Sequence, residues 1–185
     1  MRYASIRNLD ISNGANIGVA LFVQGCDRNP HCKNCFNSET WDFNSGKEWT
    51  EKTKNKFMEL IDKPYINRIS VLGGEPLAEQ NLNEVLSLIK EIRISYPEKS
   101  IWLYTGYNFD LLNSKYNEYK YTPFAVNADE WLTRWEIISN VDILVDGEYI
   151  DEQKDLSLKF RGSKNQRVID VKQSIAQNKM VLYCD

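Results

Sequence analysis

The sequence predicts an α/β fold with a mostly parallel sheet, and two observations support this prediction. Short apolar runs of strand length, such as residues 17–23 and 69–72, alternate with segments of helical periodicity, such as residues 82–92. Strands that alternate with helices are typical of parallel sheets. About four or five such units are too few to close an eight-stranded barrel, so we expect an open or partial βα barrel.

The individual elements follow from local signals along the chain. Residues 3–12 alternate weakly and predict a short edge strand, and Asn13-Gly14 predicts a turn. Thr50 is expected to cap a helix of about twelve residues that Pro64 ends. The remaining expected elements are strands at residues 100–104, 141–145, 168–170 and 180–183 and helices at residues 82–92, 109–116 and 129–138, the last capped by Asp129.

Length and composition are those of an ordinary globular chain. The 185 residues predict one domain over residues 1–185, with 42% hydrophobic and 26% charged residues. A net charge of −3 does not indicate nucleic-acid binding. No apolar run reaches the roughly 20 residues of a membrane span, and residues 1–5 lack the apolar core of a signal peptide. We therefore expect a cytoplasmic protein that binds neither nucleic acid nor a membrane.

Three of the four cysteines lie in one loop, residues 25–37, directly after the first apolar run: Cys26, Cys32 and Cys35. Thiolates are the soft ligands that iron–sulfur clusters and zinc select. Three ligands leave one coordination position open, whereas a closed structural zinc site needs four. The residues alone leave other interpretations open, namely buried free cysteines, disulfides, or a zinc site completed by His31 or Cys184.

Two later strands also end in small residues. In residues 73–76 (GGEP), Gly73 and Gly74 would let the backbone approach a ligand closely, and Glu75 would place a carboxylate beside it. By itself this motif is equally typical of a plain turn between strand and helix. Residues 105–107 (TGY) form a similar turn after the strand at 100–104. Sites in parallel sheets are built at the carboxyl ends of the strands, so we expect the site there.

Taken together, these motifs resemble the radical S-adenosylmethionine (SAM) superfamily. More specifically, the chain resembles the anaerobic (class III) ribonucleoside-triphosphate reductase activating proteins from about residue 3 to about residue 168. The run RGSKNQR after LVDGEY is typical of that family rather than of the superfamily at large. The matching segments are residues 13–14 (NG), 21–26 (LFVQGC), 35–37 (CFN), 40–41 (TW), 73–77 (GGEPL), 101–107 (IWLYTGY), 144–149 (LVDGEY) and 161–167 (RGSKNQR).

The resemblance implies a radical-generating activating enzyme. Cys26, Cys32 and Cys35 would hold three irons of a [4Fe-4S] cluster, and the fourth iron would bind the amino and carboxylate groups of SAM. Reductive cleavage of SAM would lead to a glycyl radical on the large catalytic subunit of anaerobic ribonucleotide reductase. The electron would come from a cytosolic donor such as flavodoxin or ferredoxin.

The resemblance also implies which residues contact SAM, namely Gly73, Gly74, Glu75, Thr105 and Asp146. Glu75 suits the cationic ammonium of the methionine end. The chain departs from the superfamily in one respect: five residues separate Cys26 from Cys32, where the usual spacing is C-x3-C-x2-C. The loop shape therefore does not carry over from the superfamily.

Three alternatives stay open beside this interpretation. The chain could activate a different glycyl-radical enzyme, act on a small molecule, or bind a metal without catalysis. Residues 161–167 could belong to a docking surface for the protein substrate or form a locally hydrogen-bonded loop. Cys184 lies outside the motif, so we expect it to have no role in cluster assembly.

Overall fold

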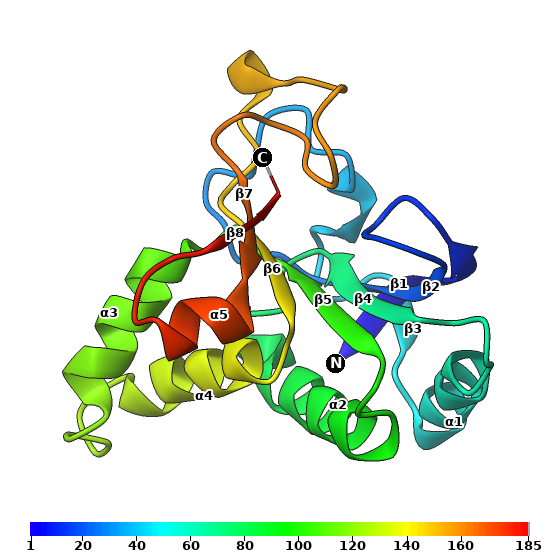
Figure 1. The fold of residues 1–185 in the computed structure, drawn as a ribbon, viewed down its shortest axis with the longest axis horizontal. Helices are drawn as coiled ribbons and strands as arrows, with labels where there is room; N and C mark the ends of the chain where they lie inside the picture. The colour runs from blue at the N-terminus through cyan, green and yellow to red at the C-terminus, as the bar shows by residue number, and fades with distance from the viewer. Residues whose placement is uncertain (185) are drawn as a thin grey trace.

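The computed structural model describes residues 1–184, in which eight strands form one sheet (Figure 1). Their order across the sheet is β3-β1-β2-β4-β5-β6-β7-β8. The strands are β1 (Arg2–Asp10), β2 (Gly18–Val23), β3 (Lys47–Glu48), β4 (Arg68–Gly73), β5 (Ser100–Tyr104), β6 (Ile143–Asp146), β7 (Arg167–Asp170) and β8 (Leu182–Cys184). The α-helices are α1 (Glu51–Ile61), α2 (Leu82–Ser95), α3 (Phe109–Tyr119), α4 (Ala128–Ser139) and α5 (Val171–Ala176).

The four central strands run parallel. β2 pairs with β4, β4 with β5 and β5 with β6, so that Leu21 lies opposite Val71 and Val71 opposite Leu103. Parallel strands need a crossover between them, and α1, α2 and α4 lie in these three connections. The carboxyl ends of all four strands consequently lie at the same edge of the sheet.

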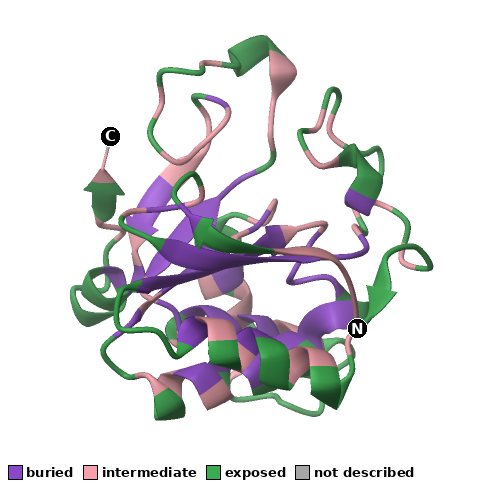
Figure 2. Ribbon diagram, turned by 90° about the vertical axis from the view of Figure 1, so that its right-hand side faces the viewer, coloured by how far each residue is buried: buried purple, intermediate pink, exposed green. Residues whose placement is uncertain are grey.

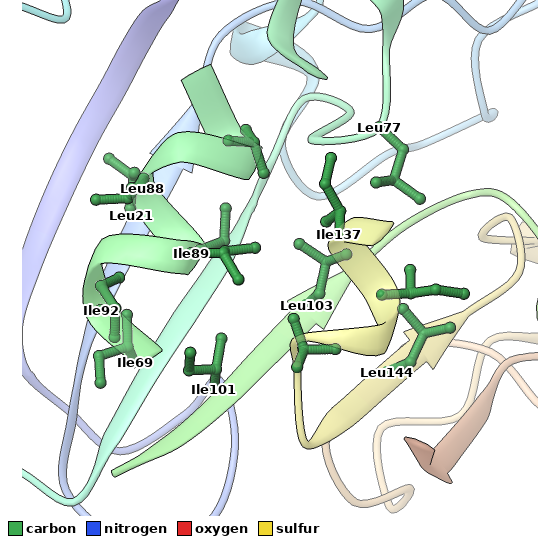
Figure 3. Packing of buried hydrophobic residues seen from close by; sticks show 14 of the residues in the cluster. Leu21, Ile69, Leu77, Leu88, Ile89, Ile92, Ile101, Leu103, Ile137 and Leu144 are labelled. Atoms are coloured by element: carbon green, nitrogen blue, oxygen red, sulfur yellow. The ribbon is translucent and has the colours of Figure 1, made fainter. Parts of the chain in front are cut away.

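The helices pack against one face of the sheet, and loops lie over the other (Figure 2). Alternate residues of each strand point toward the helices, and the spacing of the apolar residues in α2 turns one side of that helix toward the strands. The side chains that meet in this core (Figure 3) are Leu21, Ile69, Ile101, Leu103 and Leu144 of the strands, Leu88, Ile89 and Ile92 of α2, and Ile137 of α4.

Most expected elements are present, with small shifts at their ends. β2 is buried at all six positions, as a continuous apolar run predicts. The hydroxyl of Thr50 accepts a hydrogen bond from the Thr53 backbone at 3.3 Å, which confirms the predicted cap of α1. The predicted cap of α4 is wrong, because the capping residue is Asn127, and Asp129 lies in the first turn.

The expectation of a mostly parallel sheet holds for the four central strands, whereas the sheet as a whole is mixed. β1 runs antiparallel to both β2 and β3, and β7 runs antiparallel to β6 and β8. The stretch between β6 and β7 contains no α-helix that could cross over the sheet, so β7 returns beside β6 in the opposite direction. That the sheet forms an open or partial barrel stays a prediction.

Among residues 1–184, none of the helices combines the length and apolar character that crossing a membrane requires.

Candidate functional site

A cavity of about 650 Å³ lies where the parallel strands end. This volume is in the range of small-molecule and cofactor sites. Its walls come from the loop after β2 and the turns after β4, β5 and β6. The predicted site residues that line it are Cys26, Cys32, Cys35, Gly73, Gly74, Glu75 and Thr105. Motifs far apart in the sequence thus meet at one site, because the strands that precede them are parallel neighbours.

The cysteine loop is held to the protein by backbone hydrogen bonds at its start. The Gly25 N–H donates to the Thr40 carbonyl at 2.7 Å, and the Cys26 N–H donates to the Trp41 carbonyl at 3.0 Å. The Glu75 N–H donates to the Gly25 carbonyl at 2.6 Å, which joins the ends of β2 and β4. These bonds fix where the loop leaves the sheet.

The three cysteines of the loop are free thiols that face one cavity. Burial raises the pKa of Cys26 to about 11 and also raises the pKa of Cys32, although the nearby Arg28 charge acts in the opposite direction on Cys32, so both favour the thiol form. Among residues 1–184, no three His, Cys, Asp or Glu side chains are grouped closely enough to hold a metal ion. Three cysteine thiols are the kind of ligand that an iron–sulfur cluster requires. Their side chains would have to move closer together to bind one.

Two other candidate ligands are not among the residues that line the cavity. His31 lies in the cysteine loop, stacks on Trp41 with ring centroids 4.3 Å apart, and has its Nε2 3.3 Å from the Cys26 carbonyl oxygen. Cys184 packs beside the buried cluster around Trp102 on β5 and is not among the residues that line the cavity. The position of Cys184 therefore gives no support to a zinc site completed by that residue.

The glycines of the GGEP turn allow close approach between two strand ends. A Cβ at Gly74 would lie 2.1 Å from the Gly25 carbonyl oxygen, and one at Gly73 would lie 2.6 Å from the Val23 carbonyl oxygen. Gly73 also has a φ of 114°, which strains any other residue. These glycines are thus required by the protein's own backbone, whatever they contact in addition.

The Glu75 carboxylate is buried against neutral hydrogen-bond donors. Its Oε1 accepts from the Thr105 hydroxyl at 2.8 Å and the Leu77 N–H at 2.9 Å, and its Oε2 accepts from the Gly106 N–H at 2.8 Å. Burial raises its pKa to about 7, although these hydrogen bonds act in the opposite direction. A carboxylate with this environment is suited to a cationic ligand, which would stabilise its charged form.

Asp146 differs from the expectation for a SAM contact. It is fully buried and is not among the residues that line the cavity. Its carboxylate accepts from Arg167 Nε at 2.9 Å and from the Phe109 N–H at 2.8 Å, at the start of α3. After β6 the cavity is instead lined by Gly147 and Glu148.

The cysteine loop also contacts the segment after β6 along its length. The Arg28 guanidinium forms an ion pair with Glu148, and Arg28 Nη1 donates to the Gly106 carbonyl at 3.1 Å. Three further contacts are Lys33–Glu152 at 3.0 Å, Asn34–Asp151 at 2.8 Å, and Phe36–Tyr149 with ring centroids 4.9 Å apart. Residues 27–36 and 148–152 thus form two walls of the cavity that hold each other, and Arg28 belongs to the longer spacing between Cys26 and Cys32.

The RGSKNQR loop is tied to the same segment by local hydrogen bonds. Asn165 donates to the Glu148 carbonyl at 2.7 Å, and Gln166 donates to the Gly147 carbonyl at 3.0 Å. Gln166 Oε1 accepts from the Gly162 N–H at 2.9 Å. Arg161 lines the cavity, which the sequence did not indicate, because the run predicts either a docking surface or a locally hydrogen-bonded loop.

Comparison with known proteins agrees with this geometry. The model of the 4Fe-4S single cluster domain family matches residues 12–169, so the chain belongs to that family. Proteins called anaerobic ribonucleoside-triphosphate reductase-activating protein are 34% identical over 170 residues in Salmonella typhi and in Escherichia coli K12, which is 91% of this chain and 97% of each relative. The relative of that name in Enterobacteria phage T4 is also 34% identical, over 91% of this chain and 93% of its own. No solved structure matches the chain significantly.

The chain therefore belongs to the family of anaerobic ribonucleoside-triphosphate reductase-activating proteins. The prediction made from the motifs is confirmed at this level. The names of the relatives describe an activating function toward the anaerobic reductase, and the family model describes a 4Fe-4S cluster.

Proposed function

We propose that this protein is a radical SAM enzyme that generates a glycyl radical on the large catalytic subunit of anaerobic ribonucleotide reductase. The bound [4Fe-4S] cluster would pass one electron to SAM, whose cleavage gives methionine and a 5′-deoxyadenosyl radical that takes a hydrogen atom from the glycine. The electron comes from a cytosolic donor such as flavodoxin or ferredoxin, and the reaction takes place in the cytoplasm.

One observation supports this proposal most strongly: three free cysteines face the same cavity as the GGEP turn. Cys26, Cys32 and Cys35 supply three thiolates, which leaves one iron of a cubane cluster without a protein ligand. Glu75 supplies a buried carboxylate that accepts its hydrogen bonds from neutral donors, which suits the ammonium of the methionine end. The Thr105 hydroxyl orients that carboxylate and does so from the adjacent strand end.

The test is SAM cleavage by the whole protein. The protein is loaded anaerobically with iron and sulfide, supplied with reductant and SAM, and assayed for 5′-deoxyadenosine. We expect cluster-dependent 5′-deoxyadenosine and, with the large reductase subunit added, the electron paramagnetic resonance signal of a glycyl radical. Cluster assembly without 5′-deoxyadenosine, with the reductase subunit present, would contradict the proposal.

The ligand assignment is tested by iron content. Cys26→Ala, Cys32→Ala and Cys35→Ala should each abolish cluster assembly, since each removes one thiolate. Cys184→Ala is the matched control and should load as much iron as the unmodified protein, because Cys184 does not line the cavity. Normal iron in any of the first three variants would remove that residue from the ligand set.

A further inference from the structure

Arg161 lies at the wall of a cofactor-sized cavity and has no acidic partner among residues 1–184. It is partly buried and lines the cavity, and its Nε is buried with no hydrogen-bond partner in the described part of the chain. Its neighbours on the same loop are paired: Lys164 with Asp155, and Arg167 with Asp110 and Asp146. A guanidinium held at a cavity with an unused donor is suited to an anionic ligand group.

The other two arginines that line this cavity are already engaged. Arg28 shares with Arg161 a buried Nε that has no hydrogen-bond partner in the described residues, but its guanidinium forms an ion pair with Glu148 and donates to the Gly106 carbonyl. The Arg7 guanidinium lies over the Phe22 ring, 4.3 Å from its centroid. Arg161 is therefore the cavity arginine, among residues 1–184, that neither forms an ion pair with a carboxylate nor lies over an aromatic ring.

The position of Arg161 next to the cysteine loop narrows the choice of ligand. A Cβ at the following residue, Gly162, would lie 2.7 Å from Cε2 of Phe36, the residue directly after Cys35. Arg161 thus borders the part of the cavity where the cluster would be held. The Glu75 carboxylate lines the same cavity and suits an ammonium group, so the site offers both a cationic and an anionic partner for an α-amino acid.

We propose that Arg161 binds the α-carboxylate of SAM. The inference rests on the proposed function and adds to it a positioning residue that sets recognition of the methionine end. A carboxylate has about four acceptor positions, so coordination of one oxygen to iron leaves acceptors for a guanidinium. The planar fork of arginine matches such a carboxylate in geometry as well as in charge.

The experiment compares SAM with decarboxylated SAM, which lacks only the carboxylate. Dissociation constants of both ligands are measured on the cluster-loaded protein without reductant and are normalised to iron content. We expect Arg161→Gln to raise the dissociation constant of SAM roughly ten- to hundredfold, as for the loss of a charged hydrogen bond. The dissociation constant of decarboxylated SAM should not change. Arg161→Lys should recover part of the affinity for SAM. Lys164→Gln is the matched control, since it removes a positive charge from the same loop outside the cavity.

The outcomes separate this inference from the function on which it rests. Equal weakening of both ligands in Arg161→Gln would assign Arg161 a structural role and overturn the inference. Unchanged SAM affinity in that variant would overturn it as well, while leaving the radical SAM assignment intact. If the unmodified loaded protein binds neither ligand, the proposed function fails and the inference fails with it.

Discussion

Glu75 and Asp146 are both buried carboxylates at the ends of parallel strands, yet their surroundings differ. Glu75 is 1% exposed, faces the cavity and is surrounded by neutral donors. Asp146 is 0% exposed, is not among the residues that line the cavity and is paired with Arg167. The hydrogen bond to Asp146 is the main cause of the raised pKa of Arg167.

The comparison shows how to tell a structural carboxylate from one that is available to a ligand. Asp146 has its counter-charge inside the protein and also accepts from the first N–H of α3, so its interactions are complete. Glu75 has hydrogen bonds but forms no ion pair among residues 1–184, and a positively charged ligand would supply the counter-charge. The resemblance implies that both residues contact SAM, whereas in the structure only Glu75 lines the cavity.

The largest effect on stability is expected from removing the carboxylate of Asp146, which is paired with Arg167. Asp146→Ala leaves Arg167 without its buried partner and should lower the free energy of unfolding by about 3–5 kcal/mol. Asp110→Ala is the matched control, because Asp110 is an exposed partner of the same arginine, and it should cost less than about 1 kcal/mol. Urea unfolding followed by circular dichroism measures both. Equal losses would show that Asp146 is no more structural than a surface residue.

The carboxylate of Glu75 should make the free energy of unfolding depend on pH. The pKa of Glu75 is raised to about 7 in the folded protein, so the folded state holds a proton that the unfolded state releases above its ordinary value near 4.5. Stability should therefore fall as pH rises from 5 to 8, by at most about 3 kcal/mol. Glu75→Gln should reduce this slope in urea unfolding of the cluster-free protein. If the free energy of unfolding depends on pH in the same way in Glu75→Gln and in the unmodified protein, Glu75 is not the group responsible.

The affinity for SAM should also distinguish Glu75 from Asp146. Glu75→Gln removes the negative charge offered to the ammonium of SAM and should raise the dissociation constant roughly tenfold, about 1.4 kcal/mol, without loss of iron. Asp146→Asn should change SAM affinity much less, because Asp146 does not line the cavity. Equal effects of the two variants on cluster-loaded protein would erase the distinction between the two carboxylates.

The smallest effect is expected from the hydroxyl that orients Glu75. Thr105→Val removes the hydrogen bond of 2.8 Å to Glu75 Oε1 and should cost about 1 kcal/mol of unfolding free energy. It should also raise the pKa of Glu75 further, since this hydrogen bond lowers it. Thr105→Ser keeps the hydroxyl and serves as the control. If the serine variant loses as much stability as the valine variant, the methyl group rather than the hydrogen bond is responsible.

The parallel part of the fold and the location of the site could be predicted from the sequence. The apolar run ending at Val23 and the strand ending at Gly73 are local signals, and parallel strands bring their ends together whatever the details. The antiparallel return of β7 could not be predicted in the same way. Its pairing with β6 depends on the absence of a crossover helix over a long polar stretch, and residue patterns alone did not exclude one.

The individual site contacts were predictable only where a motif carried them. The GGEP turn indicated Glu75, but the partner of Asp146 is Arg167, twenty-one positions further along the chain. The Arg28–Glu148 pair joins residues separated by 120 positions. Such pairs arise from the folding of distant loops onto one edge, so no local spacing signals them.

The contacts between residues 27–36 and 148–152 have a consequence for communication within the molecule. Ion pairs, a side-chain hydrogen bond and an aromatic contact join the two segments, and the RGSKNQR loop is bonded to the second of them. We expect the two segments to shift as one unit, so that a displacement of residues 148–152 would also displace Cys32 and Cys35.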